Sequence, residues 1–188
     1  EAENGLQEAL GPKLSNGITG PEWSDETGRI GSISDSARVD IYLPKKCNGQ
    51  MIVVCPGGGY RYVSALKEGL HVADWMTARG IAVAVVKHRM PEGHWEIPVI
   101  DVQNAFRYCR AHAAEWGISQ IGVMGFSAGG HLAASASTLY VDEITRPDFS
   151  VLIYPVVSLD RKFVGQGTRN NLLGKDEMWD DKDMKVAE

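Results

Sequence analysis

The sequence has no apolar run long enough to cross a membrane as a helix, and it contains only three cysteines. Cys47, Cys55 and Cys109 lack the spacing of metal ligands, and three thiols cannot all pair with one another. Cys55 ends an apolar segment and Cys109 lies on the apolar stripe of an expected helix, so we interpret both as small buried hydrophobic residues. The sequence therefore predicts no metal site and no cofactor.

Positive charge is scarcer than negative charge. The chain has 19 lysines and arginines against 24 aspartates and glutamates, with a formal net charge of −5. This balance argues against nucleic acid or an anionic membrane as the main partner. The chain opens at Glu1 without a methionine or the apolar core of a signal peptide. The sequence therefore leaves open whether the protein is secreted or periplasmic. It also leaves open whether the protein forms a homo-oligomer.

The length of 188 residues suits a single domain with a sizeable core, and residues 1–36 are expected to form an irregular N-terminal arm. Beyond the arm, apolar segments that suit strands alternate with segments of helical periodicity. We expect strands at 38–43, 51–55, 81–86, 121–126 and 149–157, with helices at 66–80, 98–117 and 128–139. This alternation predicts an α/β fold, a mostly parallel sheet with helices on both faces, whose site lies at the carboxyl ends of the strands.

The motif Gly125-Phe126-Ser127-Ala128-Gly129 lies between an expected strand and an alanine-rich helix. A Gly-x-Ser-x-Gly sequence in this context is typical of a nucleophile elbow, which exposes the serine hydroxyl at the top of a sheet. Helix N–H groups and the helix dipole would favour negative charge beside Ser127. The motif therefore predicts Ser127 as a catalytic nucleophile.

A second glycine cluster, Pro56-Gly57-Gly58-Gly59-Tyr60, follows the expected strand at 51–55. An acyl-transfer site of this kind needs two backbone N–H groups for the oxyanion, one from the residue after the serine and one from an upstream strand-to-helix loop. Both motifs follow strands of a parallel sheet, so they can meet in space. The order and context of the two motifs predict a hydrolase.

A general base for Ser127 is hard to find in the sequence. In this kind of site an acid and then a histidine follow the serine, but His131 alone follows it, one turn along the same helix and pointing along it. The other four histidines precede the serine: His71, His88, His94 and His112. We interpret two of them as helix surface or packing residues, His88 as a residue that lines the cleft and His94 as one beside its mouth, and none as the base. Asp160 is interpreted as a capping or surface residue rather than as the triad acid.

Taken together, several segments resemble bacterial α/β-hydrolase esterases, often described as acetyl xylan esterase-like. They are residues 16–22, 55–60, 89–91, 125–131, 154–158 and 171–174. The resemblance implies a serine carboxylic-ester hydrolase that deacetylates hemicellulose sugars, with Ser127 as nucleophile. It implies that Ala128 and either Gly58 or Gly59 supply the oxyanion N–H groups, and that Tyr60 lines the acyl or sugar pocket. Pro56 departs from related lipases, which often carry histidine there, so the loop would be anchored differently.

Two further readings stay open. A serine peptidase could use the same turn and oxyanion groups, and a non-catalytic relative could keep the fold without the triad. Because the acid and base of the family lie on later strands, we expect the α/β-hydrolase domain to be incomplete at its C-terminal side. The expected partners are a small ester or acetylated sugar and a segment or polypeptide that completes the fold.

Overall fold

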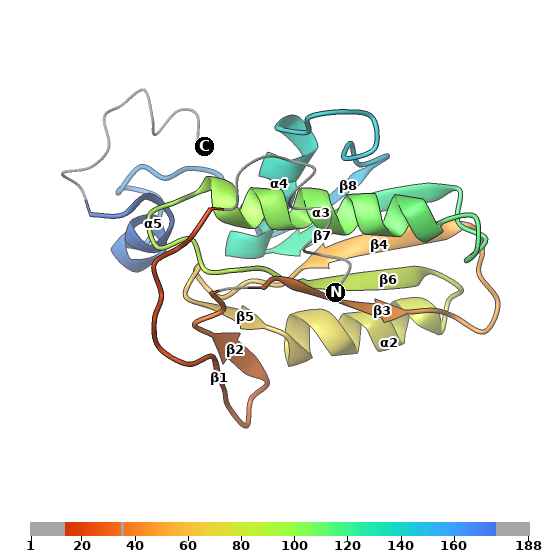
Figure 1. The fold of residues 1–188 in the computed structure, drawn as a ribbon, viewed down its shortest axis with the longest axis horizontal. Coiled ribbons are helices and arrows are strands. Elements are labelled where there is room, and N and C mark those ends of the chain that lie inside the picture. The colour runs from red at the N-terminus through yellow and green to blue at the C-terminus, as the bar shows by residue number, and fades with distance from the viewer. Residues whose placement is uncertain (1–13, 35, 176–188) are drawn as a thin grey trace.

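A five-stranded sheet forms the centre of the molecule in the computed structural model, which describes residues 14–34 and 36–175 (Figure 1). The strand order is β3-β6-β4-β7-β8, with β3 antiparallel to β6 and all other neighbours parallel. The strands are β3 (Arg38–Tyr42), β4 (Gln50–Cys55), β6 (Ala82–Lys87), β7 (Gln120–Phe126) and β8 (Ser150–Ile153). The expected mostly parallel sheet is confirmed.

Helices cover both faces of this sheet, as the alternation predicts. On one face lie α3 (Glu96–His112) and α4 (Ala128–Thr138), and on the other lie the π-helical turn η1 (Leu66–Leu70) and α2 (His71–Thr77) (Figure 1). Alternate residues of β4 point to opposite layers, with Met51 and Val53 packed toward α3 and α4, and Ile52 and Val54 packed toward α2. Because both faces are covered, β4 is apolar from Met51 to Cys55.

Element boundaries differ slightly from those expected. Pro98 lies in the first turn of α3, where its missing N–H leaves no helical bond unmade. The α2 helix ends at Thr77, earlier than expected, and Gly80 follows with a φ of 82°. Strand β8 ends at Ile153 rather than near 157, because Tyr154 takes a φ of 36° and Pro155 follows. Within the described residues no helix combines the length and apolarity that crossing a membrane requires.

A second, antiparallel sheet lies at the end of the molecule near the carboxyl ends of the parallel strands (Figure 1). It has the order β1-β2-β5, and its strands are β1 (Trp23–Ser24), β2 (Arg29–Gly31) and β5 (Tyr62–Ser64). The arm at 1–36 is therefore not irregular throughout its described part, which is a correction to the expectation. Strands of two and three residues are too short to show a period of two in the sequence. Residues 1–13 lie outside the described part.

The last described helix, α5 (Gln166–Leu173), lies at the same end of the molecule as the small sheet (Figure 1). Its Leu172 and Leu173 are 1% exposed and join the main core cluster. The N–H of Gly93 donates to the carbonyl of Asn171, which ties the helix to the loop before α3. α5 is thus fixed beside the loops that follow the parallel strands.

Candidate active site

Ser127 occupies a sharp turn between β7 and α4. Its backbone angles are φ 54° and ψ −119°, a conformation that residues other than glycine rarely adopt. The N–H of Ser127 donates to the carbonyl of Ile153 at 3.1 Å, and the N–H of Val156 donates to the carbonyl of Ser127 at 3.1 Å. These bonds to the chain after β8 hold the strained turn in place.

Close backbone contacts explain the two glycines of the motif. A Cβ atom on Gly125 would lie 2.0 Å from the carbonyl oxygen of Gly129. A Cβ on Gly129 would lie 2.1 Å from the carbonyl oxygen of Cys55, at the end of the neighbouring strand β4. Neither contact can be relieved by rotating a side chain, so both positions require glycine.

The triple-glycine loop lies directly beside this turn. Parallel pairing places Cys55 opposite Gly125, and a Cβ on Gly57 would lie only 3.2 Å from the Cβ of Ser127. The two glycine motifs therefore meet in space, as the parallel sheet predicts. Within residues 14–34 and 36–175, no backbone carbonyl accepts the N–H of Gly58 or Gly59. Ala128 is the first residue of α4, where the N–H has no partner within the helix.

Glu68 anchors the glycine loop, a residue that the sequence reasoning did not single out. The N–H of Gly57 donates to its Oε2 at 2.6 Å, and the hydroxyl of Tyr154 donates to its Oε1 at 3.1 Å. Burial and the neighbouring carboxylate both raise the pKa of Tyr154, which keeps its hydroxyl protonated as the donor. A carboxylate on η1 thus anchors the glycine loop from outside the glycine motif.

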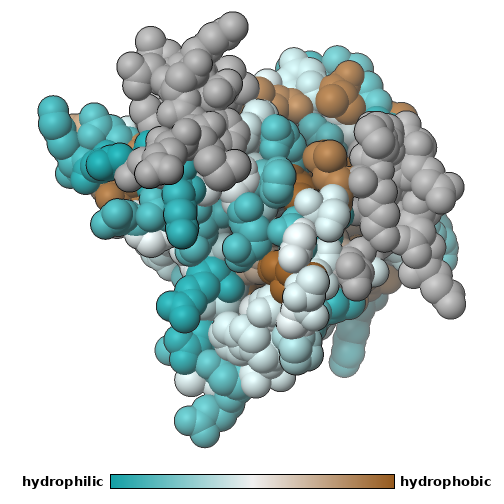
Figure 2. Space-filling view, turned by 60° about the vertical axis from the view of Figure 1, so that its left-hand side comes forward, coloured by the Kyte–Doolittle hydropathy of each residue, from teal (hydrophilic) through white to brown (hydrophobic). Residues whose placement is uncertain are grey.

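A groove of about 420 Å³ opens over Ser127 and the glycine loop. Besides Ser127, Gly58 and Gly59, it is lined by polar side chains from β5 and the residue before it, from η1 and from α5: Arg61, Tyr62, Ser64, Glu68, Thr168 and Asn171. The Nδ2 of Asn171 donates to the carbonyl of Gly59 at 2.9 Å. Figure 2 turns this end of the molecule forward and shows a largely hydrophilic surface with apolar residues in small groups. The groove is large enough for a sugar residue and its ester.

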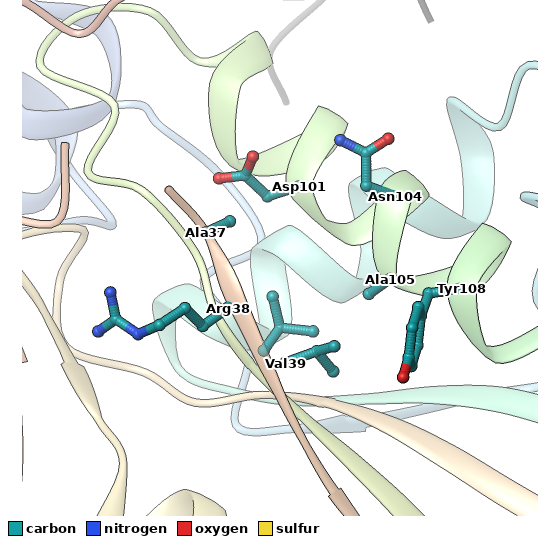
Figure 3. A pocket seen from close by; sticks show the side chains of 8 residues that line it. Ala37, Arg38, Val39, Asp101, Asn104, Ala105 and Tyr108 are labelled. Carbon is teal, nitrogen blue, oxygen red and sulfur yellow. The ribbon is translucent and has the colours of Figure 1, made fainter. Parts of the chain in front are cut away.

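A second crevice lies between β3 and α3, where Ala37, Val39, Asp101 and Tyr108 face one another (Figure 3). Its volume of about 10 Å³ is that of roughly one water molecule. Asp101 is fully buried here in an ion pair with Arg89, with 2.8 Å between Oδ1 and the guanidinium. The buried ion pair links the chain just after β6 to α3, and the crevice has no room for a substrate.

The side chain of Tyr60 does not line the groove, which corrects the expected pocket-lining role. It is 2% exposed, and its hydroxyl lies 2.7 Å from Nδ1 of His131. The positive φ of 57° at Tyr60 accompanies this inward direction, and Tyr62, two residues later, lines the groove instead. His131 is itself buried at 3% exposure on α4, so it is held in the core beside Tyr60.

All five histidines of the sequence lie in the described part, and none of them lines the groove. His88 was expected at the cleft, but it is 2% exposed, and burial lowers its pKa. His112 stacks on Trp116, with 5.0 Å between the ring centroids. His71 and His94 are exposed. The described residues therefore place no imidazole beside Ser127.

The remaining sequence interpretations concern single side chains. Asp160 is exposed, and its Oδ1 accepts the N–H of Lys162 at 2.8 Å, so it caps a turn, as the favoured interpretation has it. Cys55 and Cys109 are both fully buried, and burial raises the pKa of each thiol to about 12. Their interpretation as small buried hydrophobic residues is confirmed.

Comparison with known proteins decides the family. The family model described as BD-FAE matches residues 39–153, which is more than half of the chain. The chain belongs to the BD-FAE family. The match runs from β3 through both glycine motifs to the end of β8, so it contains the whole parallel sheet.

Relatives of this BD-FAE chain include an acetylxylan esterase and a bifunctional hydrolase. An acetylxylan esterase from Xylanibacter ruminicola is 42% identical over 155 residues, which cover 80% of this chain and 32% of that protein. The crystal structure of an acetyl ester-xyloside bifunctional hydrolase from Caldicellulosiruptor lactoaceticus has a TM-score of 0.60 and 32% identity, covering 89% of this chain and 58% of that one. These similarities confirm the α/β-hydrolase fold and the resemblance to carboxylic-ester hydrolases.

A third relative carries a covalent modification. Thermogutta terrifontis esterase 2, solved as the form phosphorylated by paraoxon, has a TM-score of 0.56 and 26% identity, covering 70% of this chain and 57% of that one. The present chain thus spans about a third of the acetylxylan esterase that it matches and a little over half of these two structures.

Proposed function

We propose that Ser127 is the nucleophile of a carboxylic-ester hydrolase that removes acetyl groups from hemicellulose sugars. The observation that carries this proposal is the strained turn at Ser127, which lies beside the triple-glycine loop and lines an open groove with it. Strain at a single non-glycine residue, fixed by surrounding bonds, is a feature of functional sites. The family and the fold are consistent with it.

The oxyanion would be held by backbone N–H groups of Ala128 and of Gly58 or Gly59. Gly57 is excluded from this role because its N–H already donates to Glu68. N–H groups fixed in advance stabilise the charge that develops on the carbonyl oxygen, and each is worth roughly a hundredfold to a thousandfold in rate. The dipole of α4 adds positive potential at the same point.

The proton of Ser127 has no acceptor among the described side chains. A serine hydroxyl attacks an ester carbon well only when a base removes its proton, and no histidine lines the groove. In the proposal, an acid and a histidine from a further segment or a second polypeptide complete the site. The 188-residue chain by itself is then expected to react slowly.

The proposed substrate class follows from the groove lining and from the relatives. Arg61, Ser64, Thr168 and Asn171 offer hydrogen-bonding groups that suit sugar hydroxyls better than a long acyl chain. The relative with 42% identity is named an acetylxylan esterase. Acetylated xylan is therefore the first substrate to test.

One observation favours a second candidate, a protein that keeps the fold without turnover. It is the lack of an imidazole beside Ser127 in the described residues, because an esterase of this type needs one. No feature of the described groove favours a peptidase over an esterase.

Reaction with a fluorophosphonate tests the proposal on the 188-residue chain itself. We expect a slowly formed adduct that mass spectrometry locates on Ser127, and imidazole added to the buffer should accelerate it by acting as the missing base. Ser127→Ala should abolish the adduct. The buried Ser135 offers a matched control, because Ser135→Ala should leave labelling unchanged. No adduct on Ser127, even with imidazole, would favour the non-catalytic alternative.

A further inference from the structure

We propose that the outer face of the small sheet β1-β2-β5 binds the sugar chain of a xylan-type polysaccharide and leads it to Ser127. This inference rests on the proposed function, because it names the part of the molecule that holds the polymer next to the reacting ester. It concerns residues outside the nucleophile and the oxyanion loop.

The two faces of the small sheet have opposite characters. Ile30 and Val63 are directly opposite each other and point inward, where they pack with Ile33 and Met90. The other face carries the residues that alternate with them. They form two cross-strand rows, Trp23 opposite Gly31 opposite Tyr62, and Arg29 opposite Ser64. The sheet thus turns its apolar side to the core and an aromatic and polar side outward.

Trp23 packs over Gly31 on the outer face, with its ring tilted by 56° to that of Tyr62. A Cβ on Gly31 would lie 2.4 Å from the indole ring, so any larger residue would push Trp23 away from the sheet. The indole and the ring of Tyr62 have centroids 6.4 Å apart, and Trp23 remains 39% exposed. The two rings together form an aromatic strip that is accessible from solvent.

This strip is continuous with the groove over Ser127. Tyr62 belongs to both, and Ser64 and Arg61 of the same segment also line the groove. The backbone of Tyr62 lies against the oxyanion loop, since a Cβ on Gly58 would lie 2.0 Å from its carbonyl oxygen. A ligand that rests on the strip therefore extends directly toward Ser127.

The chemistry of the strip fits a neutral sugar chain. Aromatic rings offer apolar faces to the C–H faces of pyranose rings, while neighbouring polar groups bond to the hydroxyls. Arg29 lies over Tyr62, with its guanidinium carbon 5.2 Å from the ring centroid, but its charge is paired with Asp25 at 2.8 Å. The paired charge and the net charge of −5 make a polyanion a poor ligand. Xylan is a neutral polymer when it carries only acetyl groups.

Affinity electrophoresis through a gel that contains soluble xylan tests this assignment in the 188-residue chain. We expect Trp23→Ala to weaken the retardation by xylan about tenfold in apparent affinity, and Trp23→Phe to retain most of it. Trp23→Leu keeps apolar packing on Gly31 without an aromatic face, so it should lose affinity even where the fold is unchanged by circular dichroism. Trp75→Ala is the matched control, because Trp75 is also exposed, at 54%, but lies on α2 and belongs to neither the small sheet nor the lining of the groove.

The outcomes separate this inference from the proposed function. Trp23→Ala should leave fluorophosphonate labelling of Ser127 unchanged, because the small probe does not reach the strip. Loss of xylan retardation in Trp23→Ala and Trp23→Leu, with retention in Trp23→Phe, supports the sugar strip even where Ser127 fails to label. Unchanged retardation in Trp23→Ala and Trp23→Leu, or an equal loss in Trp75→Ala, overturns it even where Ser127 labels normally.

Discussion

At the scale of single residues, Glu68 joins three segments that are distant in the sequence. Its two oxygens accept the N–H of Gly57 and the hydroxyl of Tyr154, so one carboxylate links the glycine loop, η1 and the chain after β8. Glu68 touches the loop rather than the reacting atoms in our account, which makes it a positioning residue. Glu68 should therefore affect the reactivity of Ser127 by fixing the position of the glycine loop.

Replacement of Glu68 tests this positioning role. Glu68→Ala leaves the N–H of the buried Gly57 without this acceptor and frees the loop. A buried donor without a partner costs about 1–3 kcal/mol of stability. We expect labelling of Ser127 by a fluorophosphonate to slow by about tenfold or more. Tyr154→Phe removes only the contact to the other oxygen at an exposed position, and its rate should stay within about twofold. Equal slowing in the two variants would contradict the role given to the Gly57 contact.

The sequence predicts some site residues and misses others for a physical reason. Ser127 and the glycine cluster carry local backbone requirements, a strained turn and close approach, which leave a visible motif. Glu68, Tyr62 and Asn171 act through contacts that only the fold creates, such as the bond from Asn171 to a carbonyl 112 residues earlier. The resemblance implies that Tyr60 lines the pocket, but its side chain is buried in the core against His131.

At the scale of elements, the junction of β7, Ser127 and α4 is packed against the end of β4. The closest approach is at Gly129, the second residue of α4, which faces the carbonyl of Cys55. Gly167 occupies the same second position in α5, and a Cβ there would meet nothing within 4 Å. Gly129 and Gly167 therefore occupy the same helix position but differ in whether a side chain fits there.

This pair gives a direct test of the packing at the elbow. Gly129→Ala forces the backbone of α4 away from β4, and we expect a loss of about 3 kcal/mol in the free energy of unfolding. Gly167→Ala should be neutral or stabilising by up to about 1 kcal/mol, because alanine suits a helix better than glycine. Denaturant unfolding of both variants measures the difference. Similar free energies would mean that the elbow is looser than described.

The elements with long apolar patterns were predictable, and the short ones were not. β4 and β6 are buried on both faces and read as continuous apolar runs, and α3 shows its stripe over several turns. β1, β2 and β5 have two or three residues each, and they exist because they pair with one another rather than through any local pattern. The proposed sugar strip lies on these unpredicted strands.

At the scale of the whole molecule, the parallel sheet brings two motifs about 70 residues apart in the chain to one edge. Ser127, the N–H groups of the glycine loop and the groove lie together there, while all five histidines lie elsewhere. The structure thus brings together Ser127, proposed as the nucleophile, and the N–H groups proposed to hold the oxyanion. The account depends on Ser127 performing the first chemical step.

Acetate release from acetylated xylan by the protein that carries this sequence, with and without Ser127→Ala, tests that claim most directly. Removal of the nucleophile from a serine hydrolase lowers turnover by several orders of magnitude, so we expect a loss of at least about a thousandfold with the fold retained. Acetate release by the Ser127→Ala protein at a rate near that of the unaltered protein would contradict the account.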